Sequence, residues 1–252
     1  MKVLITGASS GLGREMAKLL TKNYNEFVLV GRNENRLNET KDILLNLNNN
    51  LNISVIATDL TNRDNCIEIH NKVKDVDLLI NDAGFGDYGF FDETDLSKDL
   101  AMIDTNITAL HILTKLYLKD MVEKNSGHIL NVASVAGFLP GPLMTTYYAT
   151  KNYVVKLAEG IREELRRKKS KVKISILCPG PVKTNFENAA NVKFNFNGTS
   201  SVKIAKYAIK HLNRFYIVPE FKIKLARFAS KLVSSKFGAK SVYSLQSKRT
   251  KN

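Results

Sequence analysis

The stretch Lys2-Val3-Leu4-Ile5-Thr6-Gly7-Ala8-Ser9-Ser10-Gly11-Leu12-Gly13 decides the fold of this chain. A short apolar run, typical of a buried strand, leads into a glycine-rich turn, and a helical pattern follows as far as Leu20. Glycines allow a tight turn with positive φ and let the backbone approach a phosphate closely. The start of the next helix offers free N–H groups and a positive dipole end to an anion. The stretch therefore predicts a strand–turn–helix unit that binds the pyrophosphate of a dinucleotide.

Further apolar runs alternate with helix-like stretches along the first two-thirds of the chain. The expected strands are 2–5, 27–30, 53–57, 77–80, 128–133 and 173–177, and the expected helices end at residue 20 or cover about 33–47, 64–74, 96–124 and 146–169. Nearly continuous apolar strands separated by helices are typical of a parallel sheet covered on both faces. We expect an α/β fold of the Rossmann type, with a doubly wound parallel sheet in three layers. It forms a single domain over residues 1–219, followed by a basic amphipathic helical extension over residues 220–252.

Composition excludes several other classes of protein. The chain has 252 residues, of which 44% are hydrophobic and 25% charged, which is ordinary for a globular domain. Cys66 and Cys178 lie far apart and the four histidines have no close partners, so we expect neither a disulfide scaffold nor a metal. No apolar run approaches the roughly 18 residues of a membrane span. The opening residues already form a strand and a turn, so we expect no signal peptide and a cytoplasmic location.

The end of the second expected strand bears on the choice of cofactor. It reads Val30-Gly31-Arg32, about twenty residues after the glycine turn. A dinucleotide fold that prefers NAD usually presents an acid here to the ribose hydroxyl, and Gly31 stands at that position. Arg32 can bind a 2′-phosphate through charged hydrogen bonds, and Arg36 adds positive charge. NADP(H) is therefore the expected cofactor.

A tyrosine and a lysine four residues apart suggest the chemistry. Tyr147 and Lys151 fall on one face of an expected helix, and a neighbouring ammonium lowers a tyrosine pKa from about 10. Tyr147 can then act as the acid that protonates a carbonyl oxygen as hydride arrives at the carbon. Ser134 follows the strand 128–133, at the sheet edge where ligands bind. Its hydroxyl can hold the substrate oxygen beside Tyr147.

With these motifs the sequence resembles the short-chain dehydrogenase/reductase family, in its shorter branch. The resemblance covers about residues 2–185 and is carried by residues 6–13, Asp59-Leu60, Asn81-Asp82-Ala83-Gly84, Asn106, Ser134, Tyr147, Lys151 and Pro179-Gly180-Pro181-Val182-Lys183-Thr184. One departure is visible, because the family usually has Asn where this chain has Asp82. An aspartate matches asparagine in shape but carries charge and lacks the amide donor.

The resemblance implies a role for each matching residue. Tyr147 is the general acid/base, Lys151 binds the nicotinamide ribose, and Ser134 orients the substrate carbonyl. Asn106 holds a water that links Lys151 to solvent. Asp59 accepts a hydrogen bond from the adenine amino group and Leu60 lies beside the ring. The other expected cofactor contacts are Asn81, Ala83 and Gly84 at the adenosine ribose, Val182 and Thr184 at the carboxamide, and Gly7, Ser9, Ser10, Gly11, Leu12, Gly13, Arg32, Pro179 and Gly180.

The expected function is NADP(H)-dependent reduction of a ketone or aldehyde, or oxidation of the alcohol. Three segments rich in apolar residues favour an apolar or lipid-like substrate, unless they simply close the core: 85–91, 138–144 and about 186–197, the last with Phe186, Phe194 and Phe196. Two other functions stay open, a 3-oxoacyl thioester reductase and a non-catalytic NADPH-binding regulatory or membrane-associated protein. The resemblance also implies a homodimer or homotetramer.

The positive charge of the chain is concentrated at its C-terminal end. The net charge is +14, and residues 200–252 hold 13 Lys and Arg against the single acid Glu220. Phe221, Leu225, Phe228 and Leu232 recur there at helical spacing. A basic amphipathic helix can pack its apolar face over the cleft or a partner subunit, or lie on an anionic membrane surface. No nucleic-acid motif accompanies the charge, so we expect no nucleic-acid partner.

Overall fold

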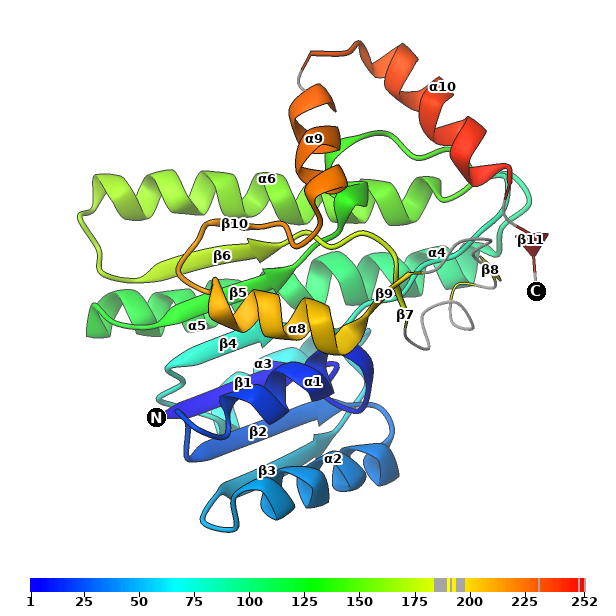
Figure 1. Ribbon diagram of the computed structural model, residues 1–252. Helices are drawn as coiled ribbons and strands as arrows, with labels where there is room; N and C mark the ends of the chain where they lie inside the picture. Colours follow the sequence, from blue (N-terminus) through cyan, green and yellow to red (C-terminus); the bar gives the residue numbers. More distant parts are fainter. Residues whose placement is uncertain (184–189, 191, 194–197, 231, 249, 252) are drawn as a thin grey trace.

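A seven-stranded parallel sheet forms the centre of the molecule, with the strand order β10-β6-β5-β4-β1-β2-β3 (Figure 1). The structure, a computed structural model, describes residues 1–183, 190, 192–193, 198–230, 232–248 and 250–251. The strands are β1 (Lys2–Thr6), β2 (Glu26–Gly31), β3 (Asn52–Ala57), β4 (Leu78–Asn81), β5 (His128–Val132), β6 (Lys173–Leu177) and β10 (Tyr216–Ile217). The chain winds outward in both directions from the junction of β1 and β4. Open α/β sheets bind ligands beyond the strand ends at such a switch point.

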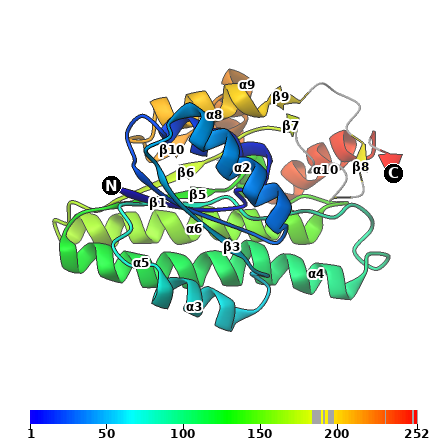
Figure 2. The ribbon, with the colours of Figure 1, turned by 90° about the horizontal axis from the view of Figure 1, so that it is seen from below.

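Helices cover both faces of this sheet (Figure 2). One face carries α1 (Gly11–Leu20), α2 (Glu34–Leu47) and α8 (Ser201–Lys210), and the other carries α3 (Arg63–Lys72), α4 (Leu96–Ile103), α5 (Leu110–Lys124) and α6 (Thr145–Arg167). Along β1, Val3 and Ile5 pack into one apolar cluster while Leu4 packs into the other, as the two-residue period of a strand requires. The expected α/β Rossmann-type fold in three layers is confirmed.

All six expected strands lie in this sheet, but the sequence did not reveal every element. The two-residue strand β10 was missed because it is too short to leave a periodic apolar pattern, and α8 was not expected either. The single helix expected over about 96–124 is interrupted by a π-helical turn at Asp104–Ala109, which separates α4 from α5. This turn places Asn106, as described below.

The C-terminal extension follows β10 and comprises α9 (Phe221–Ser230) and α10 (Ser235–Gln246), which form the upper lobe in Figure 1. Two further strand pairs are short: β7 (Val182–Lys183) pairs with β9 (Thr199–Ser200), and β8 (Val192–Lys193) pairs with β11 (Thr250–Lys251), which follows α10. The extension rests on the domain, but the stripe of Phe221, Leu225 and Phe228 stays exposed. This apolar face therefore does not pack over the cleft. Across the described ranges, no helix is both long and apolar enough to cross a bilayer.

Candidate functional site

The carboxyl ends of the strands open onto one cleft with a volume of about 510 Å³. Its wall comes from the turn after β1, the ends of β2 and β3, the loops after β4, β5 and β6, and the first turns of α6. It brings together most of the residues expected from the sequence: Gly7, Ser9, Ser10, Gly11, Leu12, Arg32, Asp59, Leu60, Ala83, Gly84, Ser134, Tyr147, Lys151, Pro179, Gly180 and Val182.

Three of the expected site residues that the structure describes do not line this cleft. Gly13 lies behind the glycine turn, and Asn106 is fully buried behind the loop after β4. Asn81 is buried, and its amide nitrogen donates to Thr114 Oγ1 at 3.1 Å and to Asn131 Oδ1 at 2.9 Å. The Asn81 side chain thus ties the sheet to α5, and the position of Asn81 at a ribose stays a prediction. Thr184 lies outside the described residues, as do Phe186, Phe194 and Phe196.

The glycine turn is compressed against its neighbours. Gly7 and Gly11 have φ angles of +73° and +57°, which other residues rarely adopt. A Cβ at Gly7 would lie 2.9 Å from the Ala83 nitrogen, and one at Gly13 would lie 2.6 Å from the Gly7 oxygen. Ser10 at the helix N-cap makes no side-chain capping bond, so it leaves the first N–H groups of α1 to another acceptor. A cradle of bare backbone at a helix start fits a pyrophosphate.

Asp82, the departure from the family pattern, stands at the centre of this arrangement. Its carboxylate accepts a hydrogen bond from the Gly13 N–H, and its own N–H donates to Thr6 Oγ1 at 3.1 Å. Burial raises the pKa of Asp82 to about 7, although nearby Lys151 and the Gly13 N–H act in the opposite direction. Neither Thr6 nor Asp82 was among the expected site residues. For Thr6, its position directly before Gly7 was the available signal.

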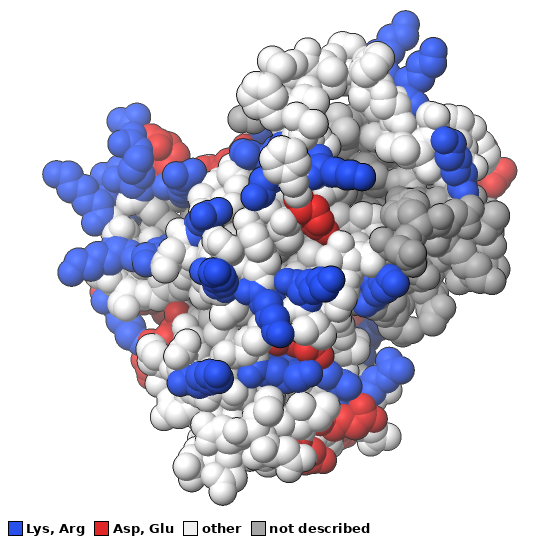
Figure 3. Space-filling model, in the orientation of Figure 1, with Lys and Arg blue, Asp and Glu red and all other residues white. Residues whose placement is uncertain are grey.

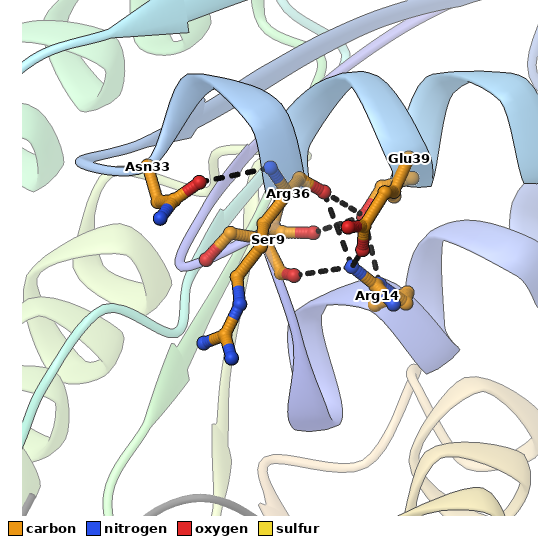
Figure 4. A network of polar contacts seen from close by, with 7 residues as sticks. Ser9, Arg14, Asn33, Arg36 and Glu39 are labelled. Carbon is orange, nitrogen blue, oxygen red and sulfur yellow. Dashed lines mark hydrogen bonds and ion pairs between the residues drawn. The ribbon is translucent and has the colours of Figure 1, made fainter.

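Three arginines lie around the turn and make different contacts, and Figure 4 shows two of them, Arg14 and Arg36. Arg14 of α1 donates to the Ser9 carbonyl at 2.6 Å and the Arg36 carbonyl at 3.1 Å, and forms an ion pair with Glu39. Figure 4 shows the Arg36 guanidinium directed away from Glu39. Arg32 and Arg36 line the cleft, and neither forms an ion pair within the described part of the chain. Sequence analysis missed Arg14, which links the turn to α2.

Tyr147 and Lys151 lie one turn apart on α6 and both line the cleft. The Lys151 Nζ is 5.8 Å from the centroid of the Tyr147 ring and donates to the Val132 carbonyl oxygen at 2.9 Å. Burial lowers the pKa of Lys151 to about 8, and the nearby Asp82 carboxylate opposes this shift. The lysine thus titrates closer to neutral pH than an exposed one.

The π-helical turn places Asn106 beside this pair. Its Oδ1 accepts from the Phe85 N–H at 3.1 Å, and its Nδ2 donates to the Phe85 carbonyl at 2.9 Å and to Thr150 Oγ1 at 3.1 Å. A Cβ at Gly84 would lie 2.8 Å from Asn106 Oδ1 and 3.4 Å from Lys151 Nζ. Asn106 therefore joins the loop after β4 to α6 next to the lysine. Turns of this kind inside helices are frequent at functional sites.

The C-terminal helix α10 contacts one of the aromatic residues that line the cleft. Phe85 and Tyr148 both line it, and the Tyr147 and Tyr148 rings meet edge to face with their centroids 6.2 Å apart. The side-chain amide of Gln246 on α10 donates to the Tyr148 hydroxyl at 2.7 Å. The backbone carbonyl of Gln246 accepts from the Tyr88 hydroxyl at 3.0 Å. Sequence analysis missed both Tyr148 and Gln246, because nothing in the motifs links residues so far apart.

Ser134 caps the short 3₁₀ helix that follows β5, and its Oγ accepts from the Ala136 N–H at 3.2 Å. The apolar segment after it contributes less to the cleft than expected, because Leu143 and Met144 are buried in the domain. Of the expected substrate segments, Phe85 lines the cleft, whereas Phe90 and Phe91 are exposed to solvent.

Comparison with known proteins decides the family. Residues 1–194 match the family model described as short chain dehydrogenase. The chain belongs to this family. One relative of this short-chain dehydrogenase is an uncharacterized oxidoreductase of Staphylococcus epidermidis, 36% identical over 186 residues that span 72% of this chain and 77% of the relative.

Two solved structures show the same fold with a nicotinamide cofactor bound. A short-chain dehydrogenase from Sphingobium yanoikuyae in complex with NADPH superposes with a TM-score of 0.84 at 26% identity and covers 91% of both chains. A short-chain dehydrogenase/reductase from Burkholderia phymatum in complex with NAD gives a TM-score of 0.81 at 26% identity, over 90% of this chain and 91% of that one. This short-chain dehydrogenase is therefore placed among oxidoreductases, and both of those structures hold a nicotinamide cofactor.

Proposed function

We propose that the protein is an NADP(H)-dependent oxidoreductase that reduces a ketone or aldehyde on an apolar or lipid-like molecule, or oxidises the corresponding alcohol. One observation carries the proposal: Ser134, Tyr147 and Lys151 line a single cleft together with a glycine turn that fits a pyrophosphate. A bound nicotinamide supplies or accepts the hydride in such a reaction. The chain supplies the groups that hold the substrate and move the proton.

Tyr147 donates its hydroxyl proton to the carbonyl oxygen in the reducing direction and takes it back in the oxidising one. The Ser134 hydroxyl holds the same oxygen in place. The Lys151 ammonium, 5.8 Å from the Tyr147 ring, favours the phenolate that remains. Asn106 lies beside Lys151 and holds the water through which the proton returns from solvent.

Arg32 and Arg36 support the preference for NADP(H). Both line the cleft at the end of β2, and the described residues hold no acid in an ion pair with either. Gly31 places no carboxylate where a 2′-phosphate would lie. The remaining cofactor contacts are assigned as the family resemblance implies, with Asp59 and Leu60 at the adenine and Val182 at the carboxamide.

The acid/base role is tested by the change Tyr147→Phe. Removal of the hydroxyl should lower carbonyl-dependent NADPH oxidation by about 10²–10⁴-fold, while NADPH binding, followed by fluorescence, stays close to wild type. Tyr153→Phe is the matched control, because Tyr153 lies on the same helix but its hydroxyl bonds to His111 at the surface. The substrate panel includes aromatic and long-chain ketones, aldehydes and a 3-oxoacyl thioester.

The outcomes of this experiment separate the competing functions. Unchanged turnover in the Tyr147→Phe variant would remove the acid/base assignment. Turnover confined to the thioester would identify a 3-oxoacyl thioester reductase. NADPH binding without turnover of any compound would indicate a regulatory protein that senses the cofactor.

We also propose that the protein works in the cytoplasm as a homodimer or homotetramer. Both cysteines are free and buried, in keeping with a reducing compartment. Helix α4 exposes Leu96 at 70% and Leu100 at 51%, beside the π-helical turn. A pair of exposed leucines on one helix face is suited to an interface with a second copy.

A further inference from the structure

Helix α9 turns its most apolar stripe toward solvent. Phe221, Leu225 and Phe228 are 79%, 61% and 64% exposed, and Leu232 just beyond the helix is 74% exposed. Their spacing of three and four residues places them on one side of the helix. Helices on a globular protein normally bury such a stripe. An exposed apolar stripe of this kind is suited to contact with a partner.

The opposite stripe of α9 attaches the helix to the domain. Ile223 and Arg227 are less exposed, and the Arg227 guanidinium lies 3.5 Å from the centroid of the Tyr216 ring and 5.6 Å from that of Phe138. Ahead of the helix, the Glu220 carboxylate accepts from the Gly180 N–H at 3.3 Å. The helix is therefore held by its more polar side, and packing against the domain does not use the outer stripe.

Helix α10 attaches to the domain through buried residues of its own. Gly238, Val242 and Gln246 are buried, and a Cβ at Gly238 would lie 2.9 Å from Leu139 Cδ2. Phe237 and Leu245 are 61% and 64% exposed, but Leu245 lies next to the buried residues around the helix, so the two form no stripe opposite them. We therefore name as the outer face only the stripe of α9 with Leu232 just beyond it: Phe221, Leu225, Phe228 and Leu232.

Positive charge surrounds the outer face. Residues 220–252 hold nine Lys and Arg against one acid, Glu220. On α9 the exposed Lys222 flanks the apolar stripe, whereas Lys224 on the other flank donates to the Tyr207 hydroxyl at 3.3 Å, and on α10 Lys236 and Lys240 are exposed. Figure 3 shows the upper lobe mostly white, with Lys and Arg toward its edges. Exposed Phe and Leu with flanking lysines are typical of a helix that lies in a membrane interface.

The positive charge around the outer face favours a lipid surface over a second copy of the chain as its partner. Lipid acyl chains can take the apolar side chains, while the lysines extend to anionic headgroups. A second copy of the chain would bring lysines against lysines, which is unfavourable. We propose that the outer face docks the protein on the surface of an anionic lipid bilayer. This docking goes beyond the oxidoreductase activity and does not depend on it.

The test is sedimentation of the full chain with vesicles of neutral phosphatidylcholine and of phosphatidylcholine mixed with anionic phosphatidylglycerol. Wild type should bind the anionic vesicles and bind the neutral ones weakly. Leu225→Ser/Phe228→Ser should lower the partition coefficient on anionic vesicles by roughly tenfold or more. Lys222→Glu/Lys240→Glu should lower it roughly 25-fold or more, since each lysine near such a surface contributes about fivefold and the reversal replaces attraction by repulsion.

A matched control uses exposed apolar residues elsewhere. Leu47 on α2 and Ile67 on α3 are 56% and 43% exposed, and Leu47→Ser/Ile67→Ser should bind as wild type does. NADPH binding and circular dichroism show that each variant is folded. Failure of wild type to bind anionic vesicles overturns the proposal, as does an equal loss in the control. If Leu225→Ser/Phe228→Ser instead converts an oligomer to a monomer by light scattering, the outer face contacts a second copy.

Discussion

Arg32 and Arg14 show how two arginines near one turn acquire different functions. Arg14 donates hydrogen bonds to the Ser9 and Arg36 carbonyls and forms an ion pair with Glu39. Arg32 forms no ion pair with the described residues and lines the cleft. The first guanidinium holds the turn, and the second lines the cleft, where we propose that it binds the 2′-phosphate.

Replacing Arg32 by Ala should therefore act on NADPH far more than on NADH. Loss of one charged hydrogen-bond partner is worth about 1.5–3 kcal/mol, so the dissociation constant for NADPH should rise about 10- to 100-fold. Fluorescence titration with each cofactor measures both constants. Arg63→Ala, at an exposed arginine on α3 outside the cleft, is the control. Equal losses for NADPH and NADH would reject the 2′-phosphate role.

At this scale the sequence predicted residues that belong to local motifs. The glycine turn, Ser134, Tyr147 and Lys151 could be located because each motif is short and adjoins a recognisable strand or helix. Arg14, Tyr148 and Gln246 could not, because their roles come from partners up to 98 residues away. The raised pKa of Asp82 could not be predicted from the sequence either, because it results from burial beside the start of α1.

The junction of β1 and α1 depends on glycines at the element scale. Gly13→Ala would place a Cβ 2.6 Å from the Gly7 oxygen, which is backbone and cannot move aside. We expect a loss of about 1–3 kcal/mol in the free energy of unfolding and much weaker NADPH binding. Gly160→Ala is the matched control, because no atom lies within 4 Å of its added Cβ and it sits inside α6.

The control should raise stability by roughly 0.5–1 kcal/mol, since alanine favours a helix interior over glycine. Urea unfolding measures both changes in one assay. A Gly13→Ala variant that is as stable as wild type would mean that the turn relaxes without cost.

Strand β5 begins with a buried titratable group. The Nε2 of His128 lies 2.8 Å from Ser175 Oγ, and burial, with a smaller effect of Lys173, lowers the pKa of His128 to about 4. In the unfolded chain this pKa is about 6.5. Between these values the unfolded chain binds a proton that the folded one does not, so stability falls as the pH is lowered.

The change His128→Gln should remove this part of the pH dependence. Wild type should lose up to roughly 3 kcal/mol through this group as the pH falls from about 6.5 to 4. The variant should therefore gain on wild type in thermal midpoint when both are moved from neutral pH to about pH 5. A difference in midpoint that stays constant over this range would contradict the assignment.

Element types followed from the sequence wherever the apolar pattern was long. The six longer strands could be predicted from their apolar runs. The two residues of β10 and the π-helical turn could not, because the first is held by pairing with β6 and the second by tertiary contacts of Asn106. The helical spacing of Phe221 to Leu232 was recognised, but its outward direction was not, since periodicity does not say which side meets the domain.

For the whole molecule, the exposed leucines of α4 bear on assembly. Light scattering of the purified protein should give a dimer or tetramer mass, and Leu100→Lys should shift it toward the monomer because a charge would be buried at the interface. Leu47→Lys, on the opposite face of the sheet and 56% exposed, should leave the mass unchanged. A monomeric wild type would exclude the proposed assembly.

Gln246 links the last helix to two tyrosines that lie far from it in the sequence. Its side-chain amide donates to the Tyr148 hydroxyl, and the Tyr148 ring meets that of Tyr147. Its backbone carbonyl accepts from the Tyr88 hydroxyl. Any displacement of α10 must break these two hydrogen bonds or carry both tyrosines with it. A shift of α10 would therefore reach Tyr148 and, through its ring, Tyr147, both of which line the cleft.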